Sequence, residues 1–290
     1  MIGIINIYKE KGYTSHDVVA IMRRLAGTKK VGHTGTLDPD ATGVLPICIG
    51  RATKLADHLA SADKTYIAEV ILGVETDTGD ISGEVIAEKP VSFDKDAIIG
   101  AVNSFAFEVR GEYLQTPPMY SAIKIGGRKL YELARKGETI ERPPRPVVIH
   151  SIQVIGFSPE KNSFTIEVSC SKGTYIRSLA MDIGKMLGCG ATMGELERTQ
   201  SGIFTKADSY KLDNVKEATE TGEFEKLLMP VEKLLPYPKL YVSGHDLTLA
   251  KNGNPLFLPT PKGKYWLCDN DETIGLFVSD SKKLRAEVML

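Results

Sequence analysis

A glycine- and proline-rich stretch near the N-terminus constrains the fold of this chain most. Residues 32–46 read GHTGTLDPDATGVLP. Its three glycines can adopt backbone angles that are closed to other residues, while its two prolines each have a fixed φ angle. No regular helix or strand is therefore expected before the apolar run that begins at Val44. We predict a long ordered loop of one shape, with Asp38 at its centre, that leads into a strand or a short helix.

Strand-like and helix-like runs both occur over the first 234 residues, and we expect an α+β fold. Thr14 and Asp17 are spaced as in a helix capping box, and apolar residues then recur on one helical face until Gly27. Turn residues separate two pairs of strand-like runs, so we predict hairpins that join 65–73 to 84–88 and 147–157 to 163–173. The other expected elements are a strand at 4–8, a helix at 94–105 capped by Asp94, extended backbone at 107–113, a short helix at 130–136 closed by Gly137, and a helix from a Thr174 cap to Met186.

The sequence changes character at about residue 235. Short strand-like runs and turns follow, as in KYWLCDNDETIGLFV (264–278), and helical periodicity is absent. A chain of 290 residues is also longer than the usual single domain. We therefore predict a main domain over 1–234 and a small, mostly β domain over 235–290.

Composition excludes several classes of protein. Hydrophobic residues make up 42% of the chain and the formal net charge is only -1, so the chain should fold as an ordinary globular protein and any nucleic-acid site must be a local basic surface. We find no membrane-length apolar run and no secretory signal, so we expect a cytoplasmic protein without a membrane partner. Four scattered cysteines without a CxxC pair are expected to be reduced and buried, and they predict no metal site.

Spacing alone leaves the role of Asp38 open. A carboxylate on a rigid loop can be a nucleophile, a general base or a metal ligand, or it can simply begin an Asp-Pro turn. The turn is the better interpretation without further information. A metal-dependent hydrolase or phosphotransferase that uses Asp38, Asp40 and His33 as ligands is a further alternative, although no second ligand cluster and no Walker-type phosphate loop accompany them.

The loop resembles the catalytic motif GxLDPxATG of the TruB-type tRNA pseudouridine-55 synthases. Further resemblance follows in the expected order: GYTSHDVV at 12–19, KTY at 64–66, PPMYSAIKIGGRKLYELAR at 117–135, CSKGTYIRSLAMDIGKMLGCGA at 170–191 and LERTQSGIF at 196–204. The similarity covers essentially the whole predicted main domain. One departure is Glu10, which stands where the family usually has a proline in a DKPxGxTS-like segment.

The resemblance implies a fold and a reaction. The fold is a mixed, mainly antiparallel central sheet flanked by helices and loops, followed by a small PUA-like domain. The reaction isomerises uridine to pseudouridine at position 55 in the T-loop of tRNA, after the base has been flipped out of the stack. Because the oxidation state does not change and nothing is added, we expect no cofactor and no metal.

The resemblance also assigns roles to particular residues. Asp38 would be the nucleophile, and Arg177 would pair with its carboxylate and favour the charged form. Tyr66 would stack on the uracil and is a candidate to relay the C5 proton. His33 would fill the space left by the flipped base, and Leu196 would form an apolar wall over it. From the residues alone, Tyr66 suits a core position equally well and Leu196 would be assigned to the core. His33 suits a structural role, and Arg177 suits solvent or phosphate.

Basic residues supply the expected RNA surface. Lysine and arginine contact phosphates and so position an RNA without reading its sequence. We assign Lys9, Arg128, Lys129 and Arg135 to binding of the tRNA T-stem-loop, although each basic cluster could equally be a solvated face. We expect a monomer, and the PUA-like domain could extend the RNA contact.

Two further alternatives remain open at this stage. In one, the chain is a non-catalytic RNA-binding or tRNA-folding protein in which Asp38 and Arg177 form only a structural ion pair. In the other, it is a pseudouridine synthase that acts on a different RNA, since the catalytic residues do not encode the substrate.

Overall fold

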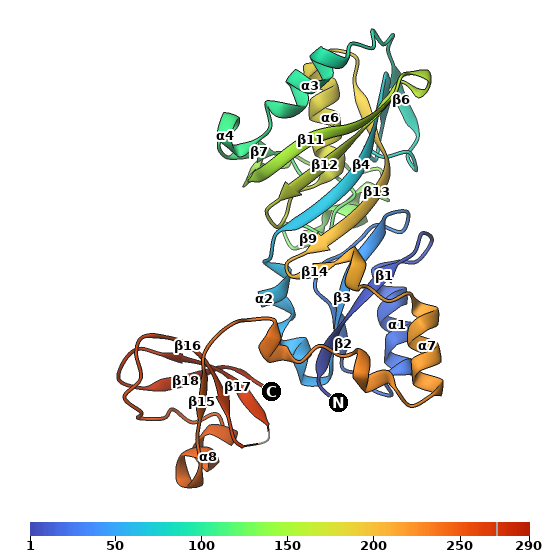
Figure 1. Ribbon diagram of the computed structural model, residues 1–290. Coiled ribbons are helices and arrows are strands. Elements are labelled where there is room, and N and C mark those ends of the chain that lie inside the picture. The colour runs from blue at the N-terminus through green and yellow to red at the C-terminus, as the bar shows by residue number, and fades with distance from the viewer. Residues whose placement is uncertain (271) are drawn as a thin grey trace. The chain divides into compact units, whose positions relative to one another are not determined.

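The computed structural model describes residues 1–270 and 272–290, which form two compact units (Figure 1). Unit 1 comprises residues 1–39, 44–60 and 203–290, and unit 2 comprises residues 40–43 and 61–202. Each unit combines strands with helices, and the α+β class expected from the sequence is confirmed.

Unit 2 is organised around an antiparallel sheet. Its strand order is β13 (Ala191–Ser201), β4 (Lys64–Leu72), β12 (Ser163–Cys170) and β11 (Ile149–Ser158). Buried and half-buried residues alternate along β4 because successive side chains point to opposite faces. Thr42 and Gly43, the first residues of β3 (Thr42–Ile49), pair in parallel with Glu197 and Arg198, which makes the sheet mixed as expected.

Gly43 is required at the point where the loop that contains Asp38 joins this sheet. Its φ angle is +109°, and a Cβ atom placed there would lie 2.1 Å from the carbonyl oxygen of Arg198. Only glycine can adopt this angle and allow so close an approach of two backbones.

Helices α3 (Lys95–Asn103) and α6 (Ile176–Met186) pack against this sheet and against each other (Figure 1). Asp94 caps α3 as predicted, because its carboxylate accepts hydrogen bonds from the amides of Asp96 and Ala97. The smaller elements of unit 2 are β5 (Val74–Thr76), β6 (Val85–Glu88), α4 (Phe107–Arg110), β7 (Tyr113–Gln115), β8 (Lys124–Ile125), β9 (Arg128–Lys129), α5 (Leu130–Ala134) and β10 (Arg145–Val147).

Unit 1 contains the N-terminal strand and its helix. Strand β1 (Gly3–Lys9) and the short β2 (Val31–His33) both lie beside β3 (Thr42–Ile49). Helix α1 (Ser15–Leu25) begins with the predicted capping box between Thr14 and Asp17. It packs against α7 (Leu212–Glu220). Unit 1 also contains α2 (Ala56–Ala60) and β14 (Phe204–Thr205).

The C-terminal part of unit 1 is a four-stranded sheet, which confirms the small β-rich domain. Its order is β15 (Lys239–Tyr241), β16 (Gly263–Cys268), β17 (Thr273–Ser279) and β18 (Leu284–Met289). A helix that the sequence analysis did not predict, α8 (Gly244–Lys251), follows β15. Trp266 and Leu276 of this sheet share one apolar cluster with Ile4 and Cys48 of the N-terminal segment. All four cysteines are free and buried.

Three local predictions were wrong. Strand β6 pairs with β5 rather than with β4, because both long edges of β4 are taken by β12 and β13. Residues 107–110 form the short helix α4 rather than extended backbone. Thr174 does not cap α6, because its hydroxyl donates to the carbonyl of Ser171, and Tyr175 occupies the cap position. The predicted hairpin of β11 and β12 is confirmed.

Candidate active site

Asp38 lies half-buried in the loop between β2 and β3, and the residues on both sides of it are held in place. The buried hydroxyl of Ser15 accepts a 2.8 Å hydrogen bond from the Leu37 amide and donates to the Leu37 carbonyl at 3.1 Å. On the other side, the carbonyl of Pro39 accepts from the amide of Gly12 at 3.0 Å. The GYTS motif therefore holds the loop at the two neighbours of Asp38.

Lys9 holds the same loop from inside the protein. Its side chain is fully buried, and its ammonium group donates to the carbonyls of Tyr13 at 2.6 Å, Pro39 at 3.0 Å and Glu10 at 3.2 Å. Three backbone acceptors offset the cost of burying the charge. Lys9 thus joins the turn after β1 to the loop that carries Asp38. The sequence did not predict this structural role of Lys9. Its contact with RNA stays a prediction.

Glu10, which replaces the family proline, is compatible with this arrangement. Its carbonyl accepts from Lys9, as described above, and its side chain forms an ion pair with Lys211 at 3.7 Å. The pair is largely exposed, so its contribution to stability is small.

His33 ends β2 on the strand side of the same loop. Its Nδ1 atom accepts a hydrogen bond from the amide of Gly35 at 3.3 Å. The ring of His16, at the start of α1, lies against it with 5.5 Å between the ring centroids. Unit 1 therefore brings together Asp38, His33 and Lys9 among the predicted residues.

Tyr66 and Leu196 lie on neighbouring strands of unit 2. Tyr66 on β4 is paired across to Arg198 of β13, and Leu196 of β13 is paired across to Ala68 of β4. Both predicted side chains are almost buried, with 9% of their surface exposed. The sheet thus places the tyrosine and the apolar residue on neighbouring strands, and their contact with a base stays a prediction.

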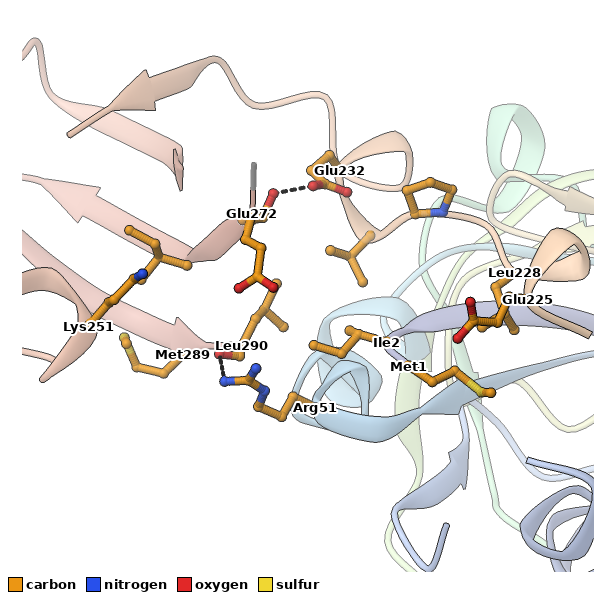
Figure 2. Close-up of a pocket in the computed structure, with 14 residues that line it drawn as sticks. Met1, Ile2, Arg51, Glu225, Leu228, Glu232, Lys251, Glu272, Met289 and Leu290 are labelled. Carbon is orange, nitrogen blue, oxygen red and sulfur yellow. Dashed lines mark hydrogen bonds between the residues drawn. The ribbon is translucent and has the colours of Figure 1, made fainter. Parts of the chain in front are cut away.

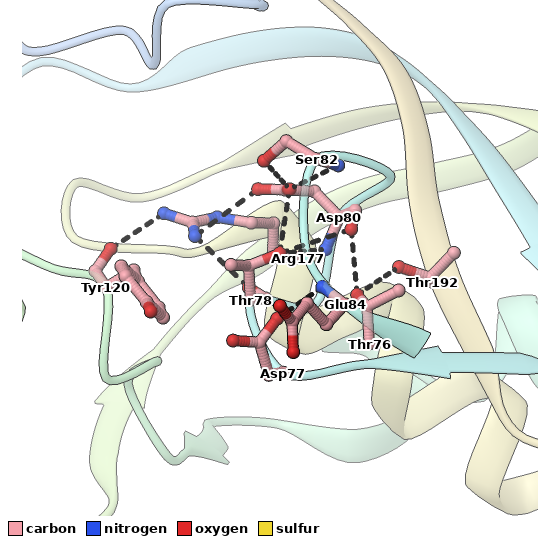
Figure 3. Close-up of polar contacts among 9 residues, drawn as sticks. All are labelled: Thr76, Asp77, Thr78, Asp80, Ser82, Glu84, Tyr120, Arg177 and Thr192. Atoms are coloured by element: carbon pink, nitrogen blue, oxygen red, sulfur yellow. Dashed lines mark hydrogen bonds and ion pairs between the residues drawn. The ribbon is translucent and has the colours of Figure 1, made fainter. Parts of the chain in front are cut away.

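Arg177 lies in the first turn of α6 and is buried, with 6% of its surface exposed. Figure 3 shows its guanidinium reaching two backbone carbonyls and one carboxylate. It donates to the carbonyl of Tyr120 at 2.9 Å and to that of Thr78 at 3.2 Å, and its Nη1 atom lies 3.4 Å from Oδ2 of Asp80. Solvent is therefore not the environment of Arg177.

Asp80 is a partner of Arg177 that sequence reasoning missed. One carboxylate oxygen, Oδ1, accepts from the hydroxyl of Thr78 at 2.9 Å and from the amide and hydroxyl of Ser82, while the other faces Arg177 (Figure 3). The hydroxyl of Thr76 donates to the Asp80 carbonyl at 2.8 Å. The sequence indicated only a turn between two strands at this position. That turn therefore also supplies a charged partner of Arg177.

Gln115 fixes the backbone from which Arg177 extends. Its side-chain amide donates to the carbonyl of Tyr175 at 3.0 Å and accepts from the amide of Tyr175 at 2.7 Å. The hydroxyl of Ser178 donates to the carbonyl of Thr116 at 2.9 Å. These bonds attach the start of α6 to the segment after β7, which no sequence pattern indicated.

Lys64, which begins β4 two residues before Tyr66, is a second buried cation of unit 2. Burial, followed by the nearby charge of Arg198, lowers the pKa of Lys64 to about 8. Its ammonium group donates to the carbonyl of Ala62. Because side chains two residues apart on a strand share a face, Lys64 and Tyr66 lie on the same face of the sheet.

Two residues of the predicted basic surface contact the side chain of Tyr131. The ammonium group of Lys129 donates to the Tyr131 hydroxyl at 3.2 Å and lies 5.3 Å from the ring centroid, and the guanidinium of Arg135 lies 5.4 Å from the same centroid. Arg128 is exposed and pairs with Glu138 at 3.2 Å. An aromatic ring flanked by two cations suits a nucleic-acid contact, and the RNA role of these residues stays a prediction.

A cavity of about 700 Å³ in unit 1 lies elsewhere (Figure 2). It is lined mainly by residues of the N-terminal segment, of the segment 225–232 and of the C-terminal sheet, including Met1, Arg51, Glu232 and Leu290, and by none of the residues predicted for the site. Over residues 1–270 and 272–290, no group of three or more histidine, cysteine or acidic side chains could hold a metal ion. None of the helices in the described part of the chain has the length and apolar character needed to cross a bilayer.

Comparisons with known proteins place the chain in a family. Residues 23–176 match the "TruB family pseudouridylate synthase (N terminal domain)", and residues 177–236 match the "tRNA pseudouridylate synthase B C-terminal domain". The chain belongs to the TruB family of pseudouridylate synthases. It is therefore an isomerase, and both the family and the enzyme class expected from the sequence are confirmed.

Relatives match over nearly the whole chain. A protein of Clostridium novyi named tRNA pseudouridine synthase B is 43% identical, and the match covers 100% of both chains. One of Geobacillus kaustophilus with the same name is 43% identical over 92% of this chain and 100% of its own. Among solved structures, a chain of an H/ACA RNP bound to a substrate RNA containing 2′-deoxyuridine is 26% identical with a TM-score of 0.71, and covers 99% of this chain and 84% of that one.

Proposed function

We propose that this enzyme isomerises uridine 55 in the T-loop of tRNA to pseudouridine, with Asp38 as the nucleophile. The relatives named tRNA pseudouridine synthase B support tRNA as the substrate. The observation that carries the assignment of Asp38 is the fixation of its loop, since Ser15 holds Leu37 and Lys9 holds Pro39. A nucleophile held in one place loses little entropy when it attacks, which lowers the barrier.

The chemistry explains why these residues would act together. The reaction breaks the bond from ribose C1′ to uracil N1, turns the detached base over, forms a bond from C1′ to C5, and releases the C5 proton. Asp38 would supply the attacking carboxylate, and the guanidinium of Arg177 would favour its charged form. Tyr66 would stack on the uracil and Leu196 would cover it, so that the detached base remains in place. His33 would fill the gap that the flipped nucleotide leaves in the RNA.

Replacement of Asp38 by asparagine tests the nucleophile. We expect Asp38→Asn to abolish release of tritium from tRNA labelled at uridine C5, while the affinity for tRNA persists, because the amide retains shape but cannot attack. Asp40→Asn is the matched control, since Asp40 lies exposed in the same loop and should be dispensable. Continued tritium release by Asp38→Asn would exclude Asp38 as the nucleophile.

The same experiment separates the alternatives. A binding or tRNA-folding protein without catalysis would release no tritium even as the wild type. A metal-dependent mechanism with Asp38, Asp40 and His33 as ligands would lose activity in excess EDTA and in Asp40→Asn, whereas we expect both to remain active.

The target position and the active species are tested with the substrate and the purified enzyme. A tRNA transcript with cytidine in place of uridine 55 should release no tritium, and an isolated T-stem-loop should still react. Release from the cytidine transcript would show that another uridine is modified. We propose that the monomer is the active species, which light scattering on the active fraction checks.

A further inference from the structure

Gln115 is the last residue of β7 and is buried, with 2% of its surface exposed. Its side-chain amide makes two hydrogen bonds to the backbone of a single residue, Tyr175, which lies 60 positions further along the chain. Oε1 accepts from the Tyr175 amide at 2.7 Å, and Nε2 donates to the Tyr175 carbonyl at 3.0 Å. Only one orientation of the side-chain amide makes both bonds, since its nitrogen cannot accept and its oxygen cannot donate.

Tyr175 occupies the cap position of α6, and its own side chain makes no capping hydrogen bond. The first amides of a helix have no partners within the helix, and side chains usually supply them. In a capping box, a glutamate or glutamine at the third helical position accepts from the amide of the cap residue. Here that position is Ser178, whose hydroxyl donates instead to the carbonyl of Thr116. Gln115 therefore supplies, from a distant strand, the acceptor that the helix itself lacks.

The second bond of Gln115 fixes the direction in which α6 begins. The Tyr175 carbonyl also accepts a bond of the helix itself, from the Leu179 amide at 3.1 Å. Arg177 lies two residues after Tyr175, so a rotation of this first turn would be enlarged at the end of its long side chain. Its guanidinium contacts, such as the 3.4 Å approach to Asp80, depend steeply on distance and angle. The orientation of Arg177 thus depends on how Gln115 holds Tyr175.

We infer that Gln115 is a positioning residue for the isomerisation, which acts by fixing the start of α6 and with it the guanidinium of Arg177. This inference rests on the proposed function of Arg177 as the partner of the Asp38 carboxylate. A side chain as buried as Gln115 does not contact the RNA. Its loss should therefore affect the chemical step rather than the binding of tRNA.

Gln115→Met tests this role, because it keeps the length of the side chain and removes both hydrogen bonds. We expect kcat for tritium release to fall by roughly ten- to hundredfold, as for other small displacements of a catalytic group. The dissociation constant for tRNA should change by less than about twofold, since the lost contact acts in the transition state. Gln153→Met is the matched control, because its amide bonds Glu167 at 2.9 Å on the exposed side of the sheet and should be dispensable. Wild-type kcat in Gln115→Met, or an equal loss in the control, would overturn the positioning role.

Gln115→Glu decides the same question if Gln115→Met does not fold. A carboxylate keeps the size of the side chain, still accepts from the Tyr175 amide, and suits the start of a helix. It cannot donate to the Tyr175 carbonyl, so kcat should fall by about threefold or more while tRNA affinity is kept. Circular dichroism verifies the fold. Wild-type kcat in the folded Gln115→Glu variant would contradict the inference.

A spectroscopic measurement without substrate follows Arg177 directly. In protein labelled with ¹⁵N-arginine, the Nε–H signal of Arg177 is the one that is absent from Arg177→Lys. It should move in Gln115→Met and in Gln115→Glu, and stay in place in Gln153→Met. An unmoved signal in both Gln115 variants would show that Gln115 does not orient Arg177. If the wild type instead released no tritium from tRNA, the proposed function would fail, while this measurement would still decide whether Gln115 orients Arg177.

Discussion

Asp38 and Arg177 are held in different ways, although we propose that they act on one uridine. The loop of Asp38 is held through backbone atoms of its neighbours, by Ser15 and Lys9 from the segment just before it. Arg177 is held through its own charged group, by atoms of Tyr120 and Asp80 from distant segments of the chain. Residues that hold a loop and lie in a motif close to it in the chain can be recognised from the sequence. A partner that is brought close only by the tertiary fold cannot. The two regions should also respond differently to substitution.

Among the residues that hold Asp38 and Arg177 in place, the largest effect is expected at Asp80. Asp80→Asn removes a charged partner of a buried arginine, and such changes cost about 3 kcal/mol or more in unfolding free energy. The guanidinium should also lose its set orientation, which we expect to lower kcat by about a hundredfold. Urea denaturation and single-turnover tritium release measure the two effects.

Asp77→Asn is the matched control for this change. Asp77 lies in the same turn and accepts a hydrogen bond from the Glu84 amide at 2.8 Å, as Asp80 accepts from Ser82, but it is not an ion-pair partner of Arg177. Equal losses of kcat in both variants would show that the shape of the turn matters and the charge of Asp80 does not.

Lys64 offers a pH-dependent test of charge burial beside Tyr66. Its pKa is lowered from 10.5 to about 8 in the folded protein, mainly by burial, so the folded state releases the proton before the unfolded state does. Below pH 8 both states are charged and the folded state carries the cost of burial. As the pH rises from about 8 toward 10.5, the wild type should gain stability relative to Lys64→Met, by up to about 3 kcal/mol.

Urea denaturation of the wild type and Lys64→Met between about pH 7 and pH 10 measures this gain. The exposed Lys161, whose charge is not among those that shift the pKa of Lys64, provides the control, because Lys161→Met should leave the pH dependence of the wild type unchanged. A constant difference between the wild type and Lys64→Met over the whole range would mean that Lys64 keeps its ordinary pKa in the fold.

Ser15 tests the other region, where backbone contacts rather than charge fix the site. Ser15→Ala removes both hydrogen bonds to the buried Leu37 backbone and should cost about 2 kcal/mol of stability. A looser loop around Asp38 should lower kcat by roughly tenfold while tRNA affinity is kept. Ser209→Ala, which removes a more exposed hydroxyl bond to the Lys206 carbonyl, should do neither. Wild-type kcat in Ser15→Ala would show that Lys9 and Gly12 suffice to hold the loop.

The same contrast explains what the sequence could and could not predict. Predictions that depend on residues close together in the chain were confirmed. They are the capping box of Thr14, the Asp94 cap and the hairpin of β11 and β12. The partner of β6 was predicted wrongly, since the sequence does not show that β12 and β13 occupy both edges of β4.

The candidate site divides in the same way. The loop around Asp38 was recognisable because one motif contains most of its residues. Asp80 was read only as part of a turn, because its importance depends on α6 arriving beside it. The buried, structural contacts of Lys9 were also missed, because a lysine in a basic segment is usually exposed. Burial and long-range pairing are thus the features that a single sequence does not reveal here.

The smallest effect is expected at Asp94, which belongs to neither region. Asp94→Ala removes the acceptor of two amide hydrogen bonds at the start of α3 and should lower the unfolding free energy by about 1 kcal/mol. Asp94→Asn should retain most of that stability because asparagine caps helices equally well. Since α3 contributes no predicted site residue, kcat should equal that of the wild type in both variants. A loss of kcat in Asp94→Ala would show that a change at the start of α3 also displaces α6, which packs against α3 and carries Arg177.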